Sequence, residues 1–301
     1  RDKIIEYRPD VMTLDIELPR MSGLEFLRKL MPQYPLPVVI ISALSEKVFD
    51  AMKAGAVDFV AKPQVTEREQ LRNFLCSELP VKIKVASTAR VSRYKKPVAF
   101  AADQHLSVRS DIDIIAIGAS TGGTEAIAEG IRDFSTDIPG TVIVQHMPPG
   151  FTEMYANRLD SQSRVKVKEA KNGDMVAPGQ VLIAPGGSEH MSIVKVGDNY
   201  KVVLKKGEKV NGHCPSVDVL FNSVADVAGA HAIGIILTGM GGDGAKGLLK
   251  MQKNGARTIG QDEASCIVYG MPKVAYDLGA VMYQEKLSDI AKKTYTLLNQ
   301  R

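Results

Sequence analysis

Residues 114–125 read IIAIGASTGGTE, and this stretch decides the class of fold. A short apolar run, Ile114–Ile117, stops at Gly118, and small residues then lead into a helical pattern. Such a run is typical of a buried strand, and the glycine-rich turn after it is typical of a strand-to-helix connection in an α/β protein. Ser120 lies in the middle of the turn. The turn therefore binds a phosphate, presents a nucleophile, or only connects the two elements.

Length and composition indicate two globular domains. The chain has 301 residues, of which 45% are hydrophobic and 24% charged, so each half can bury an ordinary core. The net charge of +4 comes without a long run of Lys or Arg, and we expect no nucleic-acid partner. No apolar run reaches the roughly 18 residues of a membrane span, and we expect no membrane insertion. The three cysteines are widely scattered, which argues against a disulfide framework and favours a cytoplasmic location: Cys76, Cys214 and Cys266.

The first part of the chain alternates strand and helix patterns. Residues 10–15 and 37–43 have the apolar character of short buried strands, and residues 55–63 indicate a turn followed by another strand. Helical patterns at 23–30 and 46–54 lie between these segments. Strands that alternate with helices predict a parallel sheet, with ligands at the carboxyl ends of its strands.

The chain then leads through a linker into a second α/β unit. A helical pattern from Thr66 to Leu79 closes the first unit, and Val81–Ser110, which has little periodicity, is predicted to be a linker. The second unit begins at Asp111. Its predicted strands lie near residues 112–117, 141–145, 180–184 and 232–238, and a β-hairpin that turns at Gly197–Asn199 is predicted for residues 193–204.

Three polar side chains follow strands of the first unit. Asp15, Ser42 and Lys62 each lie at the carboxyl end of a predicted strand, and the strand ends of a parallel sheet converge. A carboxylate can accept a phosphoryl group, a lysine ammonium can neutralise its oxygens, and a hydroxyl can bond one of them. Each residue alone is more simply an ordinary polar residue at a strand end. The combination predicts a phosphorylation site.

The segment Gly118–Gly122 has the G-x-S-x-G spacing of a nucleophile elbow, in which a tight turn exposes a serine. The small flanking residues leave room for a substrate carbonyl, and the start of the following helix offers unpaired backbone N–H groups to a developing negative charge. Glycine-rich turns are common after strands, so this motif alone is weak. A serine nucleophile also needs a base, and an acid that orients the base.

His146 and Asp243 are the candidates for that base and acid. His146 follows the predicted strand at residues 141–145, so it would leave the sheet at the same edge as Ser120. Asp243 lies in a glycine-rich segment, residues 238–247, that follows another strand. Its carboxylate can orient the imidazole, and the glycine-rich backbone can donate N–H groups to an oxyanion. The order Ser–His–Asp along the chain differs from the Ser–Asp–His order of ordinary α/β-hydrolases. Two further histidines lie in loops, where they can line a pocket without acting as the base: His190 and His213.

Two other functions compete with a serine hydrolase. A strand followed by a glycine-rich turn and a helix can bind a dinucleotide in a Rossmann-like manner, and Tyr269 and Lys273 have the Tyr-x-x-x-Lys spacing of short-chain dehydrogenases. However, Gly270 and Pro272 interrupt the helix that this motif needs. A non-enzymatic output module that docks proteins or binds DNA is the other alternative. No basic recognition helix is visible in the sequence, and that function leaves the polar residues at the strand ends unexplained.

The first unit resembles a response-regulator receiver domain. The segments TLDIELPRMSGLEFL, PVVIISA and AGAVDFVAKP resemble the second half of that domain, over about residues 1–68. The resemblance implies a partial flavodoxin-like fold in which Asp15 is the phospho-acceptor and a Mg²⁺ ligand, Ser42 the switch hydroxyl and Lys62 the phosphate-sensing lysine. Receivers carry a pair of acids for Mg²⁺ at the end of their first strand. The sequence begins after that strand, so we expect an N-terminally truncated chain whose Mg²⁺ site lacks these partner acids.

The second unit resembles the catalytic domain of chemotaxis protein-glutamate methylesterases, over about residues 112–297. The resemblance rests on the segments IAIGASTGGTEAI, QHMPPGFT, APGGSEHM, PSVDVLFNSVA, ILTGMGGDGAKG and EASCIVYGMP. It implies a doubly wound, mainly parallel α/β domain. It also implies Ser120, His146 and Asp243 as a catalytic triad, with the backbone N–H of Met240 as an oxyanion donor.

The two resemblances together imply a phosphorylation-activated serine hydrolase that demethylates glutamate methyl esters on methyl-accepting chemotaxis receptors and releases methanol. They further imply deamidation of selected glutamines, a chemotaxis histidine kinase as phosphodonor, and an unphosphorylated receiver that covers the active site. Hydrolysis is expected to need no cofactor, whereas Mg²⁺ is expected for phosphorylation of the receiver. The expected domain boundaries are residues 1–68 for the receiver, 69–110 for the closing helix and linker, and 111–301 for the catalytic domain.

Overall fold

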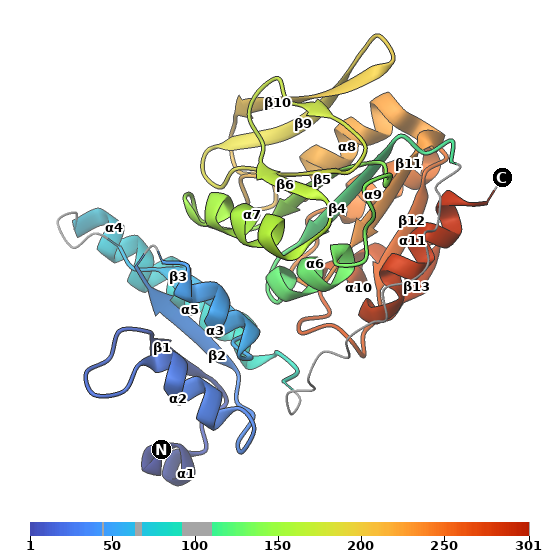
Figure 1. The fold of residues 1–301 in the computed structure, drawn as a ribbon. Helices are drawn as coiled ribbons and strands as arrows, with labels where there is room; N and C mark the ends of the chain where they lie inside the picture. The colour runs from blue at the N-terminus through green and yellow to red at the C-terminus, as the bar shows by residue number, and fades with distance from the viewer. Residues whose placement is uncertain (44, 64–67, 92–109, 301) are drawn as a thin grey trace. The chain divides into compact units, whose positions relative to one another are not determined.

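The structure, a computed structural model, describes residues 1–43, 45–63, 68–91 and 110–300 (Figure 1). The chain divides into two compact units, Arg1–Phe100 and Ala101–Arg301. Of the predicted linker, residues 92–109 lie outside the described residues. Within the described ranges, no helix has both the length and the apolar character that crossing a membrane requires.

A parallel three-stranded sheet with the order β1-β2-β3 forms the centre of the first unit, which confirms the predicted strand–helix alternation. Its middle strand is the most apolar, and Val38, Val39 and Ile40 are fully buried. The strands are β1 Met12–Asp15, β2 Val38–Ser42 and β3 Asp58–Ala61, and the helices before and between them are α1 Asp2–Tyr7, α2 Gly23–Leu30 and α3 Lys47–Lys53.

The helical segment that closes the first unit is longer than the sequence pattern predicted. It consists of α4 Arg68–Asn73, the π-helical segment η1 Phe74–Glu78 and α5 Leu79–Ser87. The prediction that the linker starts at Val81 is therefore wrong. Lys82 and Lys84 alternate with apolar residues and hide the helical period, whereas tertiary contacts fix the helix: Lys82 Nζ lies 2.8 Å from the buried Asp58 Oδ2 of β3.

A parallel seven-stranded sheet is the centre of the second unit, with the strand order β13-β12-β11-β4-β5-β8-β6. The observed order and direction confirm the predicted mainly parallel sheet. The strands are β4 Ile114–Ala119, β5 Gly140–Gln145, β6 Lys166–Glu169, β8 Gln180–Ile183, β11 Ala232–Ile236, β12 Arg257–Gln261 and β13 Tyr283–Glu285.

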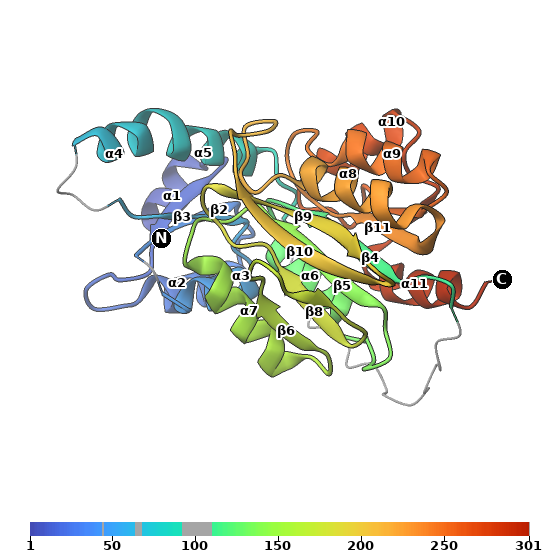
Figure 2. The same ribbon diagram turned by 90° about the horizontal axis from the view of Figure 1, so that it is seen from above.

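Helices cover both faces of this sheet, as in a doubly wound fold. Figure 2 shows α8, α9 and α10 on one side of β4 and β11, with α6, α7 and α11 on the other. Every residue of β4 and β5 is buried, because these central strands are covered on both faces. The helices are α6 Gly123–Ile131, α7 Phe151–Gln162, α8 Val217–Ala228, α9 Ala245–Lys253, α10 Met271–Asp277 and α11 Ile290–Leu298.

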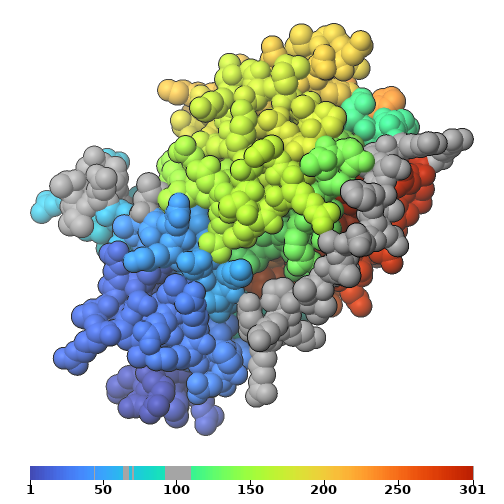
Figure 3. Space-filling model, in the orientation of Figure 1, coloured from blue at the N-terminus to red at the C-terminus, as the bar shows by residue number. Residues whose placement is uncertain are grey.

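A smaller antiparallel sheet of three strands, β7-β10-β9, packs beside α8. Its strands β9 Glu189–Val196 and β10 Asn199–Lys206 form the predicted hairpin, with the two-residue turn at Gly197 and Asp198. The third strand is β7 Met175–Val176. The hairpin lies at the surface of the second unit (Figure 3).

Candidate active site

Ser120 lies in the turn between β4 and α6. Gly122 has a φ of 77°, a left-handed conformation that glycine adopts without strain, and it is the residue that precedes the helix. The turn is fixed by a hydrogen bond from the Gly123 N–H to the Ser120 carbonyl oxygen, 2.7 Å, and Ser120 donates its own N–H to the Thr238 carbonyl oxygen, 3.0 Å. Ser120 is only 7% exposed.

His146 leaves the sheet beside Ser120. The register of the parallel strands β4 and β5 pairs Ala119 with Gln145, so Ser120 and His146 are the next residues on adjacent strands. The His146 N–H donates to the Ala119 carbonyl oxygen over 3.2 Å. The side-chain amide of Gln145 donates to the carbonyl oxygens of both Ser120, 2.9 Å, and His146, 3.2 Å. These hydrogen bonds fix the backbone of Ser120 relative to the backbone of His146.

Asp243 contacts the imidazole of His146. His146 Nε2 lies 2.9 Å from Asp243 Oδ2, and the two side chains are 6% and 1% exposed. Burial raises the pKa of Asp243, but the hydrogen bonds from His146 and Asn211 lower it more, so the pKa lies well below its usual range. An ionised carboxylate can only accept, which assigns the ring proton to Nε2. His146 Nδ1 is buried and has no hydrogen-bond partner in the described part of the chain.

The Asp243 carboxylate also lies at the N-terminus of α8. Oδ2 accepts from the Val217 N–H, 2.7 Å, and Oδ1 accepts from the Asp218 N–H, 3.2 Å. The hydroxyl of Ser216, the residue before the helix, donates to Oδ1 over 2.7 Å. Unpaired N–H groups and the helix dipole both favour a negative charge at this position. The protein therefore holds Asp243 ionised and fixed in place.

The glycine-rich segment after β11 approaches Ser120 closely. A Cβ at Gly239 would lie 2.7 Å from Ser120 Cβ and 2.4 Å from Met271 Sδ, so only glycine fits. The next residue, Met240, has a side chain that is 46% exposed, and in the described ranges its backbone N–H donates no hydrogen bond. The Met240 N–H is thus available beside the serine turn, where an oxyanion needs a donor.

The other histidines differ from His146 in their contacts. Both ring nitrogens of His190 are used, since Nδ1 accepts from the Ser216 N–H, 3.1 Å, and Nε2 lies 2.8 Å from the Glu208 carbonyl oxygen. His231 Nδ1 lies 2.6 Å from the Asp111 carbonyl oxygen. The ring of His213 stacks on the ring of His146. His105 lies outside the described residues.

Sequence reasoning missed the side chains that support His146 and Asp243. No sequence pattern predicted a role for Asn211 or Ser216, and His213 was predicted only to line a pocket. Ser216 had a signal, because a serine directly before an apolar helical pattern is a typical helix N-cap. Asn211–Gly212 is a typical turn dipeptide, but nothing in it indicates which carboxylates the asparagine side chain reaches.

The structure brings Asp15 and Lys62 together in the first unit. Lys62 Nζ lies 2.5 Å from Asp15 Oδ2, at the carboxyl ends of β1 and β3. Burial raises the pKa of Asp15, but the hydrogen bonds from Lys62 and from the Glu17 backbone outweigh it, so the pKa is lowered. Ser42 ends β2 at the same edge, and its carbonyl oxygen accepts from the Lys62 N–H, 2.7 Å. Its hydroxyl is buried, and no hydrogen bond joins it to Asp15 within the described residues.

These residues alone do not fit a Mg²⁺ ion. Mg²⁺ prefers an octahedral set of oxygen ligands, whereas Asp15 is the only carboxylate among the three predicted receiver residues. Its Oδ2 is already occupied by the Lys62 ammonium. In the described residues, no group of three or more His, Cys, Asp or Glu side chains is arranged to hold a metal.

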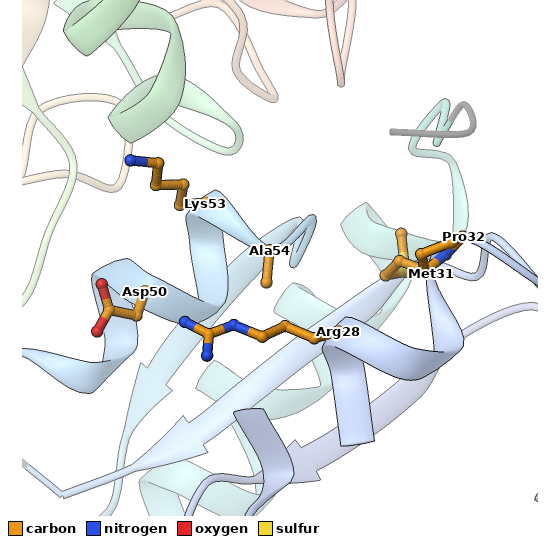
Figure 4. Close-up of a pocket in the computed structure, with 6 residues that line it drawn as sticks. All are labelled: Arg28, Met31, Pro32, Asp50, Lys53 and Ala54. Carbon is orange, nitrogen blue, oxygen red and sulfur yellow. The ribbon is translucent and has the colours of Figure 1, made fainter. Parts of the chain in front are cut away.

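A pocket of about 260 Å³ lies elsewhere in the first unit. Figure 4 shows the Arg28 side chain reaching from α2 toward α3, which carries Asp50 and Lys53. None of the predicted site residues lines it. The lining residues are Arg28, Met31, Pro32, Asp50, Lys53 and Ala54.

Tyr269 and Lys273 are not arranged as the short-chain dehydrogenase motif requires. Tyr269 precedes α10, which starts at Met271, so Tyr269 and Lys273 do not share a helix face. The Tyr269 hydroxyl accepts from the Gln284 amide, 2.7 Å, whereas Lys273 Nζ pairs with Asp277 Oδ2, 2.5 Å. The two side chains therefore bind different partners.

Comparison with known proteins extends over both units. Residues 115–294 match the family described as CheB methylesterase, and residues 1–75 match the response regulator receiver domain. A protein from Syntrophomonas wolfei named protein-glutamate methylesterase/protein-glutamine glutaminase 2 is 62% identical over 300 residues, which cover 100% of this chain and 87% of that protein. A protein from Syntrophotalea carbinolica with the name protein-glutamate methylesterase/protein-glutamine glutaminase is 50% identical over 311 residues, covering 100% and 88%.

The second unit is also similar to a solved structure. The crystal structure of the Thermotoga maritima CheB methylesterase catalytic domain has a TM-score of 0.60 and 38% sequence identity to this chain. The match covers 62% of this chain and 98% of that one.

Proposed function

Because this chain belongs to the CheB methylesterase family, we propose that it is a phosphorylation-activated serine hydrolase that removes methyl groups from glutamate methyl esters on chemotaxis receptors. The observation that carries this proposal is that Ser120 and His146 follow adjacent strands at the same edge of the sheet, with Asp243 hydrogen-bonded to His146 Nε2. A nucleophile, a base and an orienting acid are the parts that ester hydrolysis by a serine needs.

In the first half of the reaction, His146 Nδ1 takes the proton of the Ser120 hydroxyl while Oγ attacks the ester carbonyl carbon. Nδ1 is suited to this role because it carries the free lone pair of the ring, whereas Nε2–H donates to Asp243. The tetrahedral intermediate collapses when the imidazolium returns the proton to the departing methoxide, which leaves as methanol. The carboxylate of Asp243 stabilises the imidazolium between these two proton transfers.

In the second half, water attacks the acyl-enzyme with His146 again as the base, and glutamate and the free Ser120 hydroxyl are released. Negative charge on the carbonyl oxygen forms twice, once in each half-reaction. We propose that the backbone N–H of Met240 bonds this oxygen, and such a donor is worth roughly 3–4 kcal/mol in other hydrolases. The same steps deamidate a glutamine when ammonia, rather than methanol, is the leaving group.

The first unit regulates this chemistry through Asp15. A chemotaxis histidine kinase donates the phosphoryl group to Asp15, and the Lys62 ammonium, already bonded to that carboxylate, neutralises the added charge. Ser42 is the hydroxyl at the same edge that bonds a phosphoryl oxygen. Phosphorylation shifts the equilibrium away from a state in which the receiver covers the active site. Asp15, Ser42 and Lys62 alone do not fit Mg²⁺. We therefore propose Mg²⁺ only for a receiver that also carries the acidic pair.

Receptor glutamates on the cytoplasmic side of the membrane are the proposed substrates, and we propose that the chain acts in the cytoplasm. Methanol release from methylated receptor membranes tests the function directly. Ser120→Ala should abolish release, whereas the matched variant Ser161→Ala should not, because the Ser161 hydroxyl donates to the Arg158 carbonyl oxygen on the exposed side of α7. Unchanged release by a folded Ser120→Ala protein would contradict the proposal.

A further inference from the structure

A tight turn, Val210–His213, lies against the buried His146–Asp243 pair. Two hydrogen bonds of 3.0 Å close it, one from the Val210 N–H to the His213 carbonyl oxygen and one in the reverse direction. Asn211 and Gly212 between them have φ angles of 52° and 83°. Asparagine and glycine are the residues that adopt this left-handed conformation most readily, so the sequence Asn–Gly fits the turn.

The side chain of Asn211 bonds two buried carboxylates at once. Its Nδ2 lies 2.8 Å from Asp243 Oδ1 and 2.7 Å from Asp218 Oδ2. Burial raises the pKa of Asp218, and the nearby Asp243 charge raises it further. A neutral donor between the two carboxylates supplies one hydrogen bond to each without adding charge. Asn211 therefore holds Asp243 through the same Oδ1 atom that accepts from Ser216 and from the α8 N-terminus.

The ring of His213 contacts His146, the other member of the His146–Asp243 pair. It stacks on the His146 ring with a centroid distance of 3.6 Å and an interplanar angle of 8°. Turning His146 about its Cβ–Cγ bond would drive a ring edge into this neighbour. The stack therefore keeps Nε2 directed at Asp243, and it leaves Nδ1 free for the proton of the nucleophile.

We propose that the turn Val210–His213 positions the acid and the base together, through the Asn211 amide and the His213 ring. This inference rests on the function proposed above, and it adds two positioning residues to the three catalytic ones. Neither residue transfers a proton. Because the two contacts come from one closed turn, displacement of the turn releases Asp243 and His146 at the same time.

Variants of His213 separate ring stacking from any other role of this residue. His213→Phe keeps a flat ring in the stack, whereas His213→Ala removes the ring. We expect His213→Ala to lower kcat for methanol release by roughly 10- to 100-fold with KM nearly unchanged, and His213→Phe to restore kcat to within about threefold of the wild type. His231→Ala is the control, because His231 bonds the Asp111 carbonyl oxygen and touches neither member of the pair. Equal losses in His213→Phe and His213→Ala would overturn the stacking role.

A variant of Asn211 separates the amide from the backbone of the turn. Asn211→Gly removes the side chain but keeps a residue that favours positive φ, so the turn itself should persist. We expect a fall in kcat of roughly 10-fold or more in a protein that still folds, with a lower thermal unfolding midpoint because two buried carboxylates each lose a hydrogen bond. Wild-type kcat in Asn211→Gly would show that the amide does not position Asp243.

Proton NMR of the full chain without substrate tests the positioning of His146 without measuring methanol release. The proton on His146 Nε2, bonded to a buried carboxylate, should give a resolved downfield resonance in the wild type and in His213→Phe. It should broaden or disappear in His213→Ala. An unchanged resonance in His213→Ala would overturn the inference. A wild type that shows this pattern but releases no methanol would support the positioning role and contradict the proposed function.

Discussion

His146 Nε2 and Asp243 Oδ2 lie 2.9 Å apart although 97 positions separate the two residues in the chain. The parallel sheet makes this contact possible, because β5 delivers His146 and the loop after β11 delivers Asp243 to the same edge. Desolvation of the carboxylate is compensated by hydrogen bonds from a histidine, an asparagine, a serine and the α8 N-terminus. The fold therefore stabilises the Asp243 carboxylate in its ionised form.

The first prediction concerns the pH dependence of stability. The folded-state pKa of Asp243 is lowered, so ionised Asp243 contributes stability that is fully present above its unfolded pKa of about 3.9. This contribution is lost as the pH falls from there through the folded-state value. In Asp243→Asn it is absent, so the free energy of unfolding of the second unit should vary less with pH below about 4 than in the wild type. Urea unfolding at a series of pH values measures both curves, and parallel curves would contradict the account.

The second prediction compares two glycines of the second unit. A Cβ at Gly239 collides with Ser120 and Met271, whereas a Cβ at Gly130 in α6 meets no atom within 4 Å. Gly239→Ala should therefore displace the serine turn and lower turnover by roughly 100-fold. Gly130→Ala should leave turnover unchanged and stabilise the protein by about 0.5–1 kcal/mol.

Methanol release and thermal unfolding of both variants check this comparison. Equal turnover in Gly239→Ala and the wild type would mean that the segment does not press against the serine turn as described.

The third prediction concerns regulation by the first unit. A chain that begins at Asp111 lacks the receiver, so nothing can cover the active site, and its turnover should exceed that of the unphosphorylated full chain. Equal turnover of the two proteins on methylated receptors would rule out the covering model.

The fold was largely predictable because its signals are local and strong. Apolar runs such as Ile114–Ile117 and Val38–Ile41 have no polar residue to disturb the strand pattern, and each became a central strand. The helix α5 was missed because Lys82 and Lys84 alternate with apolar residues, and only the contact with Asp58 shows that this segment packs on the sheet. Strand β12 was also missed, since its polar residues Thr258 and Gln261 are buried.

The candidate site was predictable only in part. Sequence reasoning can place Ser120, His146 and Asp243 at one sheet edge, because each follows a strand and strand ends share an edge. It could not predict the contacts of Asn211 and His213 with the catalytic pair, because the loop after β10 has no period that fixes where its side chains point. Their contacts arise from the tertiary path of that loop, which no local pattern encodes.

Turnover of the two single variants and the double variant of His146 and Asp243 tests the central claim most directly. If the acid works only by orienting and stabilising the base, its loss should cost little once the base is gone. The account therefore predicts that His146→Ala with Asp243→Ala releases methanol at about the rate of His146→Ala alone. Losses that multiply, so that the double variant is slower by the product of the two single effects, would contradict the claim that the two residues act as one unit.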